Sequence, residues 1–300
     1  MTTENLLRSL MFVPGHNRKL LSSASRSEAD VLLLDLEDSV QPLENKALAR
    51  DLIKEYVNDG AFKNHKVFPR INDRESGELL KDLMELTIDG IDGFVYPKSQ
   101  TGQDIYFIDK LLETIEYEKG IEPGKFKLIP LIETPGAVLN AQDICKMSDR
   151  VIGIAYGCED YLTALEGIHD ADESSLFVPR SMIAMAARAC GVIPIDTVHI
   201  KVHDLEDLEK NLIIAKNLGF EGMLVLNPKE IPLVHKYFTP DLQAVQDAER
   251  MVSLADKASK EGKGVALIDG QFIGPPMLAT ARKILAKHKL IEAKRSIGNN

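Results

Sequence analysis

Short, almost continuous runs of apolar and β-branched residues recur along the chain at intervals of about 20 to 45 residues. Such runs are typical of strands buried on both faces of a sheet, as in parallel sheets covered by helices. They span residues 9–15, 30–38, 66–72, 93–99, 127–134, 150–160, 196–202 and 222–228. The pattern therefore predicts eight buried strands.

Between these runs, apolar residues fall three and four positions apart, which is the period of an amphipathic helix. Clear examples span residues 75–90, 104–120 and 205–220, and each has a glycine at or next to its end that can stop a helix. Eight strands alternating with helices favour a TIM (β/α)₈ barrel. An open doubly wound sheet is the alternative, but no GxGxxG follows the first strand.

Two further helical stretches, 240–260 and 275–290, follow the eighth strand. They are joined by GKGVALIDGQFIGPP, whose glycines and prolines indicate a loop or flap. We therefore expect a barrel over residues 1–235 and a C-terminal helical extension with a flap over residues 236–300. The extension is a candidate for packing on a neighbouring subunit.

Composition narrows the class of protein. The 300 residues are 44% hydrophobic and 27% charged, with a net charge of −10, which argues against nucleic acid as a partner. The sequence contains no stretch apolar enough to span a bilayer and no signal-peptide pattern at its start, so we expect no membrane partner and a cytoplasmic location. Cys145, Cys158 and Cys190 are odd in number and far apart, which favours reduced thiols.

Polar side chains follow the expected strands at their C-terminal ends, where a barrel gathers its active site. Any one of them could be a loop residue or a helix cap, but the set at one rim favours a functional site. Its members are Asp35, Glu37, Asp38, Arg70, Asn72, Lys98, Glu133, Thr134, Glu159, Asp160 and Asn227.

Within this rim, Glu133 and Asp160 end neighbouring strands, so their side chains can converge. Two carboxylates without a histidine or cysteine cluster suit a hard cation, Mg²⁺ or alternatively Mn²⁺. Arg70 can hold a carboxylate through two parallel hydrogen bonds. A metal and an arginine at one rim favour a small-molecule substrate that is a 2-oxo or 2-hydroxy acid.

Five short motifs in order carry a resemblance to a known family. They read RSLMFVPGHNRKLL, LLLDLEDSVQPLENKALAR, PRIN, LIETPGA and YGCEDYLTALEG. Together they resemble the citrate lyase β-subunit-like family, within the malyl-CoA lyase and HpcH/HpaI aldolase group, from about residue 8 to 285.

This resemblance implies a TIM barrel assembled as trimers or hexamers, and a Mg²⁺-dependent lyase or synthase. The bond would be a carbon–carbon bond of an acyl thioester such as citryl-, malyl- or citramalyl-CoA. The resemblance also implies that Glu133 and Asp160 bind the metal. It places Arg70, Pro14 and the amides at Gly157 and Glu159 around the 2-oxo acid, and gives Arg70, Glu37 and Asp38 roles in catalysis. Arg8, Lys19 and Lys46 would lie near CoA.

The chain departs from the family pattern at two places. The flap reads DGQFIGPPM, with Gly274 where the family places an acid/base aspartate, and Asp269 is the nearest acid of that loop. Asn227 stands where many members have histidine. Three hypotheses stay open: an acyl-CoA lyase, a metal-dependent aldolase on free 2-oxo acids, and an impaired ligand-binding or assembly subunit.

The three acids after the second strand bear on this choice. Aldolases of the group carry a histidine in a D-x-E-H stretch, where this chain has Asp38. Asp38 therefore disfavours the aldolase hypothesis. We expect Asp35, Glu37 and Asp38 to hold Arg70, nearby amides or metal-bound waters rather than the metal itself.

Overall fold

The structure, a computed structural model, describes residues 5–170, 173–260, 266–268 and 271–298. The chain divides into two compact units. One runs from Leu7 to His235 and holds the sheet; the other is formed from Lys236 onward, with the segment up to Leu6.

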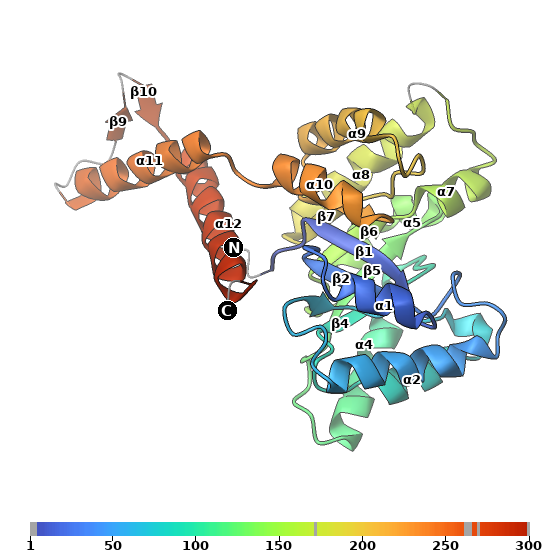
Figure 1. The fold of residues 1–300 in the computed structure, drawn as a ribbon. Helices are drawn as coiled ribbons and strands as arrows, with labels where there is room; N and C mark the ends of the chain where they lie inside the picture. The colour runs from blue at the N-terminus through green and yellow to red at the C-terminus, as the bar shows by residue number, and fades with distance from the viewer. Residues whose placement is uncertain (1–4, 171–172, 261–265, 269–270, 299–300) are drawn as a thin grey trace. The chain divides into compact units, whose positions relative to one another are not determined.

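The larger unit is built on eight parallel strands surrounded by helices (Figure 1). The strands are β1 (Ser9–Pro14), β2 (Val31–Asp35), β3 (Lys66–Val67), β4 (Gly93–Tyr96), β5 (Lys127–Ile132), β6 (Gly153–Tyr156), β7 (Ile193–Asp196) and β8 (Gly222–Val225). Their order in the sheet is β3-β2-β1-β8-β7-β6-β5-β4. This arrangement confirms the TIM barrel.

The segment after β3 closes the barrel, because its backbone bridges β2 and β4. Arg70 forms parallel bridges with Asp35 on one side and with Val95 on the other. Its N–H donates to the Leu34 carbonyl at 3.0 Å, and the Val95 N–H donates to the Pro69 carbonyl at 2.9 Å. The residue expected to bind substrate is thus part of the sheet itself.

Helices follow each strand, and several begin at sequence-encoded caps. Thr101 and Asp104 form a capping box at α4, and Thr134 caps α5 directly ahead of Pro135. The helices of this unit are α1 (Arg18–Ala24), α2 (Asn45–Asn58), α3 (Leu79–Leu86), α4 (Gly102–Glu118), α5 (Pro135–Leu139), α6 (Ala141–Lys146), α7 (Cys158–Leu165), α8 (Ser174–Cys190), α9 (Leu205–Leu218) and α10 (Ile231–Phe238), with 3₁₀ turns η1 (Arg74–Ser76) and η2 (Pro228–Glu230). Among the described helices, none has the length and apolar character needed to cross a membrane.

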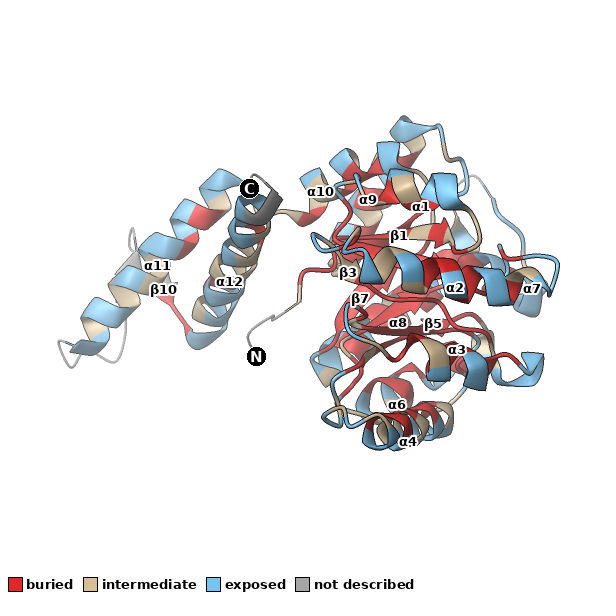
Figure 2. Cartoon of the chain, turned by 60° about the horizontal axis from the view of Figure 1, so that its bottom comes forward, coloured by how far each residue is buried: buried red, intermediate tan, exposed pale blue. Residues whose placement is uncertain are grey.

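The strands form the core, and the outer faces of the helices are exposed (Figure 2). Side chains from different strands fill the interior of the barrel, among them Leu10, Leu33, Val95, Ile129 and Leu224. Burying one such side chain contributes roughly 1.5–3 kcal/mol of transfer free energy. The core therefore gives the rim a rigid base.

All eight strands end before the predicted runs do, and the seventh also begins earlier. The seventh was predicted at 196–202, but the structure places it at Ile193–Asp196. Pro194 lies within it, and a proline normally argues against a central strand. The sixth was predicted to reach residue 160, but β6 ends at Tyr156 and α7 begins at Cys158.

The C-terminal unit contains two helices and a small hairpin. α11 (Leu242–Lys260) and α12 (Pro275–Gly298) pack on each other, and β9 (Ala266–Ile268) pairs antiparallel with β10 (Gln271–Ile273). The hairpin coincides with the expected flap segment. Gly274 links β10 to α12, and its carbonyl accepts from the Met277 N–H at 3.1 Å. Asp269 lies outside the described residues.

Close packing of β8 against the chain before β1 gives a stability prediction. A Cβ added at Gly222 would lie 1.8 Å from the Leu7 carbonyl oxygen, so the backbone would have to move. We expect Gly222→Ala to lower the free energy of unfolding by about 3 kcal/mol, measured by urea denaturation. Gly136→Ala is the control, since its nearest contact would be 3.6 Å; equal stability of the two variants would contradict the prediction.

Candidate active site

The site centres on the buried guanidinium of Arg70. Its Nε and Nη2 donate to the two oxygens of Asp35 at 2.6 and 2.7 Å. Its Nη1 lies 3.0 Å from Glu37 Oε2 and 3.2 Å from Asp38 Oδ2. Burial disfavours the charged guanidinium, but the carboxylates of Asp35 and Glu37 outweigh burial and raise the pKa of Arg70.

Asp35 also shapes the loop after β2. Its Oδ1 accepts from the Glu37 N–H and its Oδ2 from the Ser39 N–H, both at 3.0 Å. Burial would raise the pKa of Asp35, but the Arg70 charge and these hydrogen bonds hold that pKa below its ordinary value. The carboxylates of this loop therefore lie close together because they share one arginine.

The side-chain ammonium of Lys46, a residue expected near CoA, holds the same loop. The side chain is buried, and Nζ donates at 2.7 Å to the carbonyls of Leu36 and Glu37 and to Asn72 Oδ1. An ammonium has three donors, so all of them are used within the protein. These contacts disfavour the expected position of Lys46 near CoA, which stays a prediction, and they make the lysine a tether for the loop.

Lys98 links the arginine cluster to Glu133. Its Nζ lies 2.9 Å from Glu37 Oε1 and 3.0 Å from Asp73 Oδ2. Its backbone has a φ of 52°, which is uncommon for a residue other than glycine. This conformation lets its N–H donate to Glu133 Oε2 at 2.6 Å. Sequence reasoning placed Lys98 at the rim but missed this backbone role.

Glu133 is a buried carboxyl, 3% exposed, at the end of β5. Burial is the largest reason why the pKa of Glu133 rises to about 7, and the charges of Glu37 and Asp160 add to it. Asp160 is exposed in the first turn of α7, and its charge is one of the causes that raise the pKa of Glu133. A buried carboxyl beside other acids fits a cation site, because a cation would offset both burial and repulsion.

Gly157 makes room for the side chain of Glu133. A Cβ at residue 157 would lie 2.6 Å from Glu133 Cγ. The Gly157 N–H donates to the Ile132 carbonyl at 3.0 Å, and a contact of the amides around Gly157 with a substrate stays a prediction. The side chain of Glu159 is directed to His169, with 2.8 Å between Oε1 and Nε2.

The remaining expected residues lie at different ends of the barrel. Pro14 ends β1 at the rim, and Lys19 is exposed in the first turn of α1 that follows. Arg8 precedes β1 at the opposite end, where it is buried and its Nε lies 2.8 Å from Asp30 Oδ2. Burial and pairing with Asp30 at this end of the barrel disfavour the expected contact of Arg8 with CoA, which stays a prediction.

Comparison with known proteins places this geometry in a family. A family model described as HpcH/HpaI aldolase/citrate lyase matches residues 8–228. The chain belongs to this family. Citrate lyase subunit beta of Haemophilus influenzae is 34% identical over 284 residues, covering 95% of this chain and 97% of the relative. L-malyl-CoA/beta-methylmalyl-CoA lyase of Rhodobacter capsulatus is 27% identical and covers 95% of each chain.

Solved structures of the HpcH/HpaI aldolase/citrate lyase family share the fold. CitE from Mycobacterium tuberculosis, in complex with magnesium, acetoacetate and coenzyme A, is 25% identical with a TM-score of 0.69, covering 94% of this chain and all of that one. A citrate lyase from Burkholderia xenovorans is 18% identical with a TM-score of 0.79, covering 95% and 92%, and shows the fold alone.

The sequence differs from the expected family pattern at Asn227 and Gly274, and the structure gives a local reason for asparagine at residue 227. Asn227 caps the turn η2: its Oδ1 accepts from the Lys229 N–H at 3.0 Å, and Glu230 completes the capping box. Asparagine is a strong cap, so the residue has a structural role here. Gly274, directly ahead of α12, has no side chain that could exchange a proton.

The raised pKa of Glu133 predicts a pH dependence of stability in the absence of divalent metal. The pKa is about 7 in the folded protein and 4.5 in the unfolded chain, so the unfolded state loses its proton first as the pH rises. Stability from this residue is full below pH 4.5 and falls by about 3 kcal/mol up to pH 7. Glu133→Gln should remove this fall, measured by urea denaturation in EDTA.

The control for this experiment is Glu122→Gln, at an exposed position of a surface turn. This variant should keep the wild-type dependence on pH. Identical pH profiles for Glu133→Gln and the wild type would show that residue 133 titrates as an ordinary glutamate.

The tether at Lys46 and the exposed Lys19 make a matched pair for a second prediction. Lys46→Met leaves three buried acceptors without their donor, so we expect the free energy of unfolding to fall by roughly 2–4 kcal/mol. Lys19→Met should change it by less than about 0.5 kcal/mol, because the side chain is exposed. A Lys46→Met protein as stable as the wild type in urea denaturation would exclude the tether.

Proposed function

We propose that the protein is a Mg²⁺-dependent carbon–carbon lyase or synthase acting on a hydroxyacyl-CoA or acyl-carrier thioester, with a 2-oxo acid and an acetyl thioester as products. The observation that carries this proposal is the buried Glu133, whose pKa of about 7 and whose neighbour Asp160 favour a bound cation. Named relatives support the class: they include malyl-CoA lyases, and the CitE complexes contain magnesium with coenzyme A or oxaloacetate.

Glu133 and Asp160 would hold the metal in this proposal. Oxygen ligands suit Mg²⁺, and the ion would polarise the carbonyl or hydroxyl oxygen of the substrate when bound. Acidic side chains outnumber basic ones in this part of the rim. The basic ones are Arg70 and Lys98, and the acidic ones are Asp35, Glu37, Asp38, Asp73, Glu133 and Asp160. An anionic substrate therefore needs an additional positive charge at this rim.

Arg70 would bind the carboxylate of the 2-oxo acid by exchanging one of its present partners. Asp35 is buried and holds two donors of the guanidinium, so this contact is fixed. The side chain of Asp38 is 59% exposed and lies at 3.2 Å, the longest of these contacts. Asp38 is therefore the carboxylate that a substrate can displace, while Asp35 keeps the arginine in place.

Glu37 is the group best placed to exchange the hydroxyl proton. Burial is the main cause that raises its pKa above the ordinary value, and its carboxylate lies between Arg70 and Lys98. In cleavage, Glu37 would accept the hydroxyl proton as the carbon–carbon bond breaks. The electron pair of that bond would stay with the thioester fragment, which leaves as its enolate. A proton must then reach the enolate carbon, and Gly274 cannot supply it.

CoA would approach from the side of α1, where Lys19 is exposed. With Arg8 and Lys46 committed to other contacts, Lys19 is the member of the expected basic set that is accessible to phosphates. Assembly as a trimer or hexamer, with the C-terminal unit against a neighbouring subunit, stays a prediction from the family resemblance.

The test is an assay of hydroxyacyl-CoA thioesters and free 2-oxo acids with and without Mg²⁺. We expect thioester cleavage that needs Mg²⁺, and a loss of about 100-fold or more in kcat/KM for Glu133→Gln and Asp160→Asn, since each removes a ligand of the cation. Asp149→Asn, an exposed acid ahead of β6, is the matched control.

Other outcomes would support the alternatives. Cleavage of free 2-oxo acids but not thioesters would favour the aldolase hypothesis. Metal-dependent binding of 2-oxo acid without turnover, and turnover gained in Gly274→Asp, would favour an impaired subunit. Full activity of Glu133→Gln without Mg²⁺ would overturn the metal site.

A further inference from the structure

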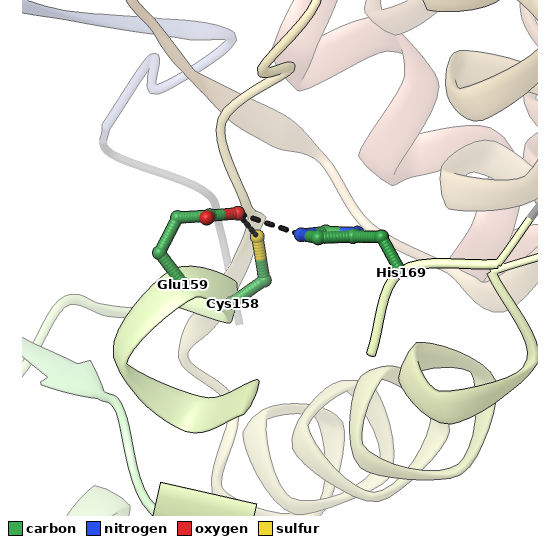
Figure 3. A group of neighbouring side chains, drawn as sticks. All are labelled: Cys158, Glu159 and His169. Atoms are coloured by element: carbon green, nitrogen blue, oxygen red, sulfur yellow. Dashed lines mark hydrogen bonds and ion pairs between the residues drawn. The ribbon is translucent and has the colours of Figure 1, made fainter. Parts of the chain in front are cut away.

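A second group of side chains able to bind a metal lies at the start of α7, next in sequence to Asp160 of the proposed magnesium site. It consists of Cys158, Glu159 and His169, whose side chains point toward one another (Figure 3). Glu159 Oε1 lies 2.8 Å from His169 Nε2 and 3.4 Å from Cys158 Sγ. One sulfur, one oxygen and one nitrogen atom therefore meet within 4.8 Å of one another.

The backbone after α7 brings these residues together although ten positions separate Glu159 from His169. Glu166 ends the helix with a φ of 55°, and the Gly167 N–H donates to the Leu162 carbonyl at 2.9 Å. This reversal of the chain returns His169 to the first turn of α7. Cys158 is fixed by its own N–H, which donates to Thr197 Oγ1 at 3.1 Å.

From this geometry we propose a binding site for a borderline-soft divalent cation, with Zn²⁺ as the natural ion and Co²⁺ as its spectroscopic substitute. Around a tetrahedral Zn²⁺ the ligand atoms would lie roughly 3.3–3.6 Å apart, given Zn–S and Zn–N lengths of about 2.3 and 2.1 Å. The sulfur–oxygen contact already has this length, and the nitrogen–oxygen contact must open by roughly 0.5 Å. Binding releases the thiol proton and leaves a fourth position for water.

Burial and chemistry distinguish this site from the one at Glu133. Cys158 is buried, while the side chains of Glu159 and His169 are 55% and 29% exposed, so one ligand is fixed and two can adjust. Cys158 and His169 also line a small pocket with Thr197 and His199, which gives the fourth ligand a polar surround. Thiol and imidazole ligands select Zn²⁺ over Mg²⁺.

The test is a Co²⁺ titration of the reduced full-length protein in saturating Mg²⁺, which occupies any site made of oxygen ligands. We expect the near-ultraviolet absorption of a thiolate–Co²⁺ bond at one equivalent, and displacement of the signal by Zn²⁺. Cys158→Ser should abolish the absorption. His169→Asn removes a ligand at a position partly open to solvent. Loss of a residue that only supports a ligand weakens metal binding by roughly 10- to 100-fold, so we expect at least this loss of Co²⁺ affinity.

Cys190→Ser and His203→Asn are the matched controls, because they remove a cysteine and a histidine outside the cluster. Both should bind Co²⁺ as the wild type does. Absence of the thiolate absorption in the wild type would overturn the site, as would its persistence in Cys158→Ser. Unchanged affinity in folded His169→Asn would also overturn it. None of these readouts depends on lyase activity.

Discussion

The buried ion pair between Arg70 and Asp35 joins the closure of the barrel to the chemistry of its rim. The Arg70 backbone bridges β2 and β4, and its side chain returns to Asp35 at the end of β2 with two parallel hydrogen bonds. Removing one partner of such a pair strands a buried charge, at a cost of roughly 3–5 kcal/mol. The barrel and the site are therefore stabilised by the same contact.

Around this pair, acidic groups are tolerated because each has a specific partner. Asp35 accepts loop amides, Glu37 pairs with Lys98, and Lys46 holds the carbonyls of the same loop. Glu133 differs, because a backbone N–H is the donor that reaches it and burial keeps its pKa high. The weak compensation of Glu133 fits its expected role in binding a cation.

The sequence predicted the barrel and the set of polar residues at its rim, because both follow from the spacing of buried strands. It did not predict which basic side chains are buried. Lys46 has the sequence context of a solvated helix lysine, yet it is buried under the loop after β2. Arg8 stands near the rim in sequence, but the length of β1 places it at the other end.

Strand β7 was misplaced for a local reason, since Pro194 interrupts a run that otherwise resembles a strand. In the structure the Pro194 carbonyl accepts a hydrogen bond from the Glu221 N–H at 3.0 Å. The proline therefore still takes part in the hydrogen bonding of the sheet, although it has no N–H to donate. The role of the Lys98 N–H could not be predicted, because it depends on a positive φ that the sequence PKS does not encode.

The contact between Gly157 and Glu133 has a consequence for how this protein can diverge. Any side chain at residue 157 would collide with the glutamate, and shortening residue 133 would leave a gap beside the glycine. The two positions are thus coupled in packing: a side chain at residue 157 fits only where the side chain at residue 133 is smaller or displaced. Among homologues, a larger residue at 157 should accompany loss of the glutamate, and so mark lineages that have given up this cation.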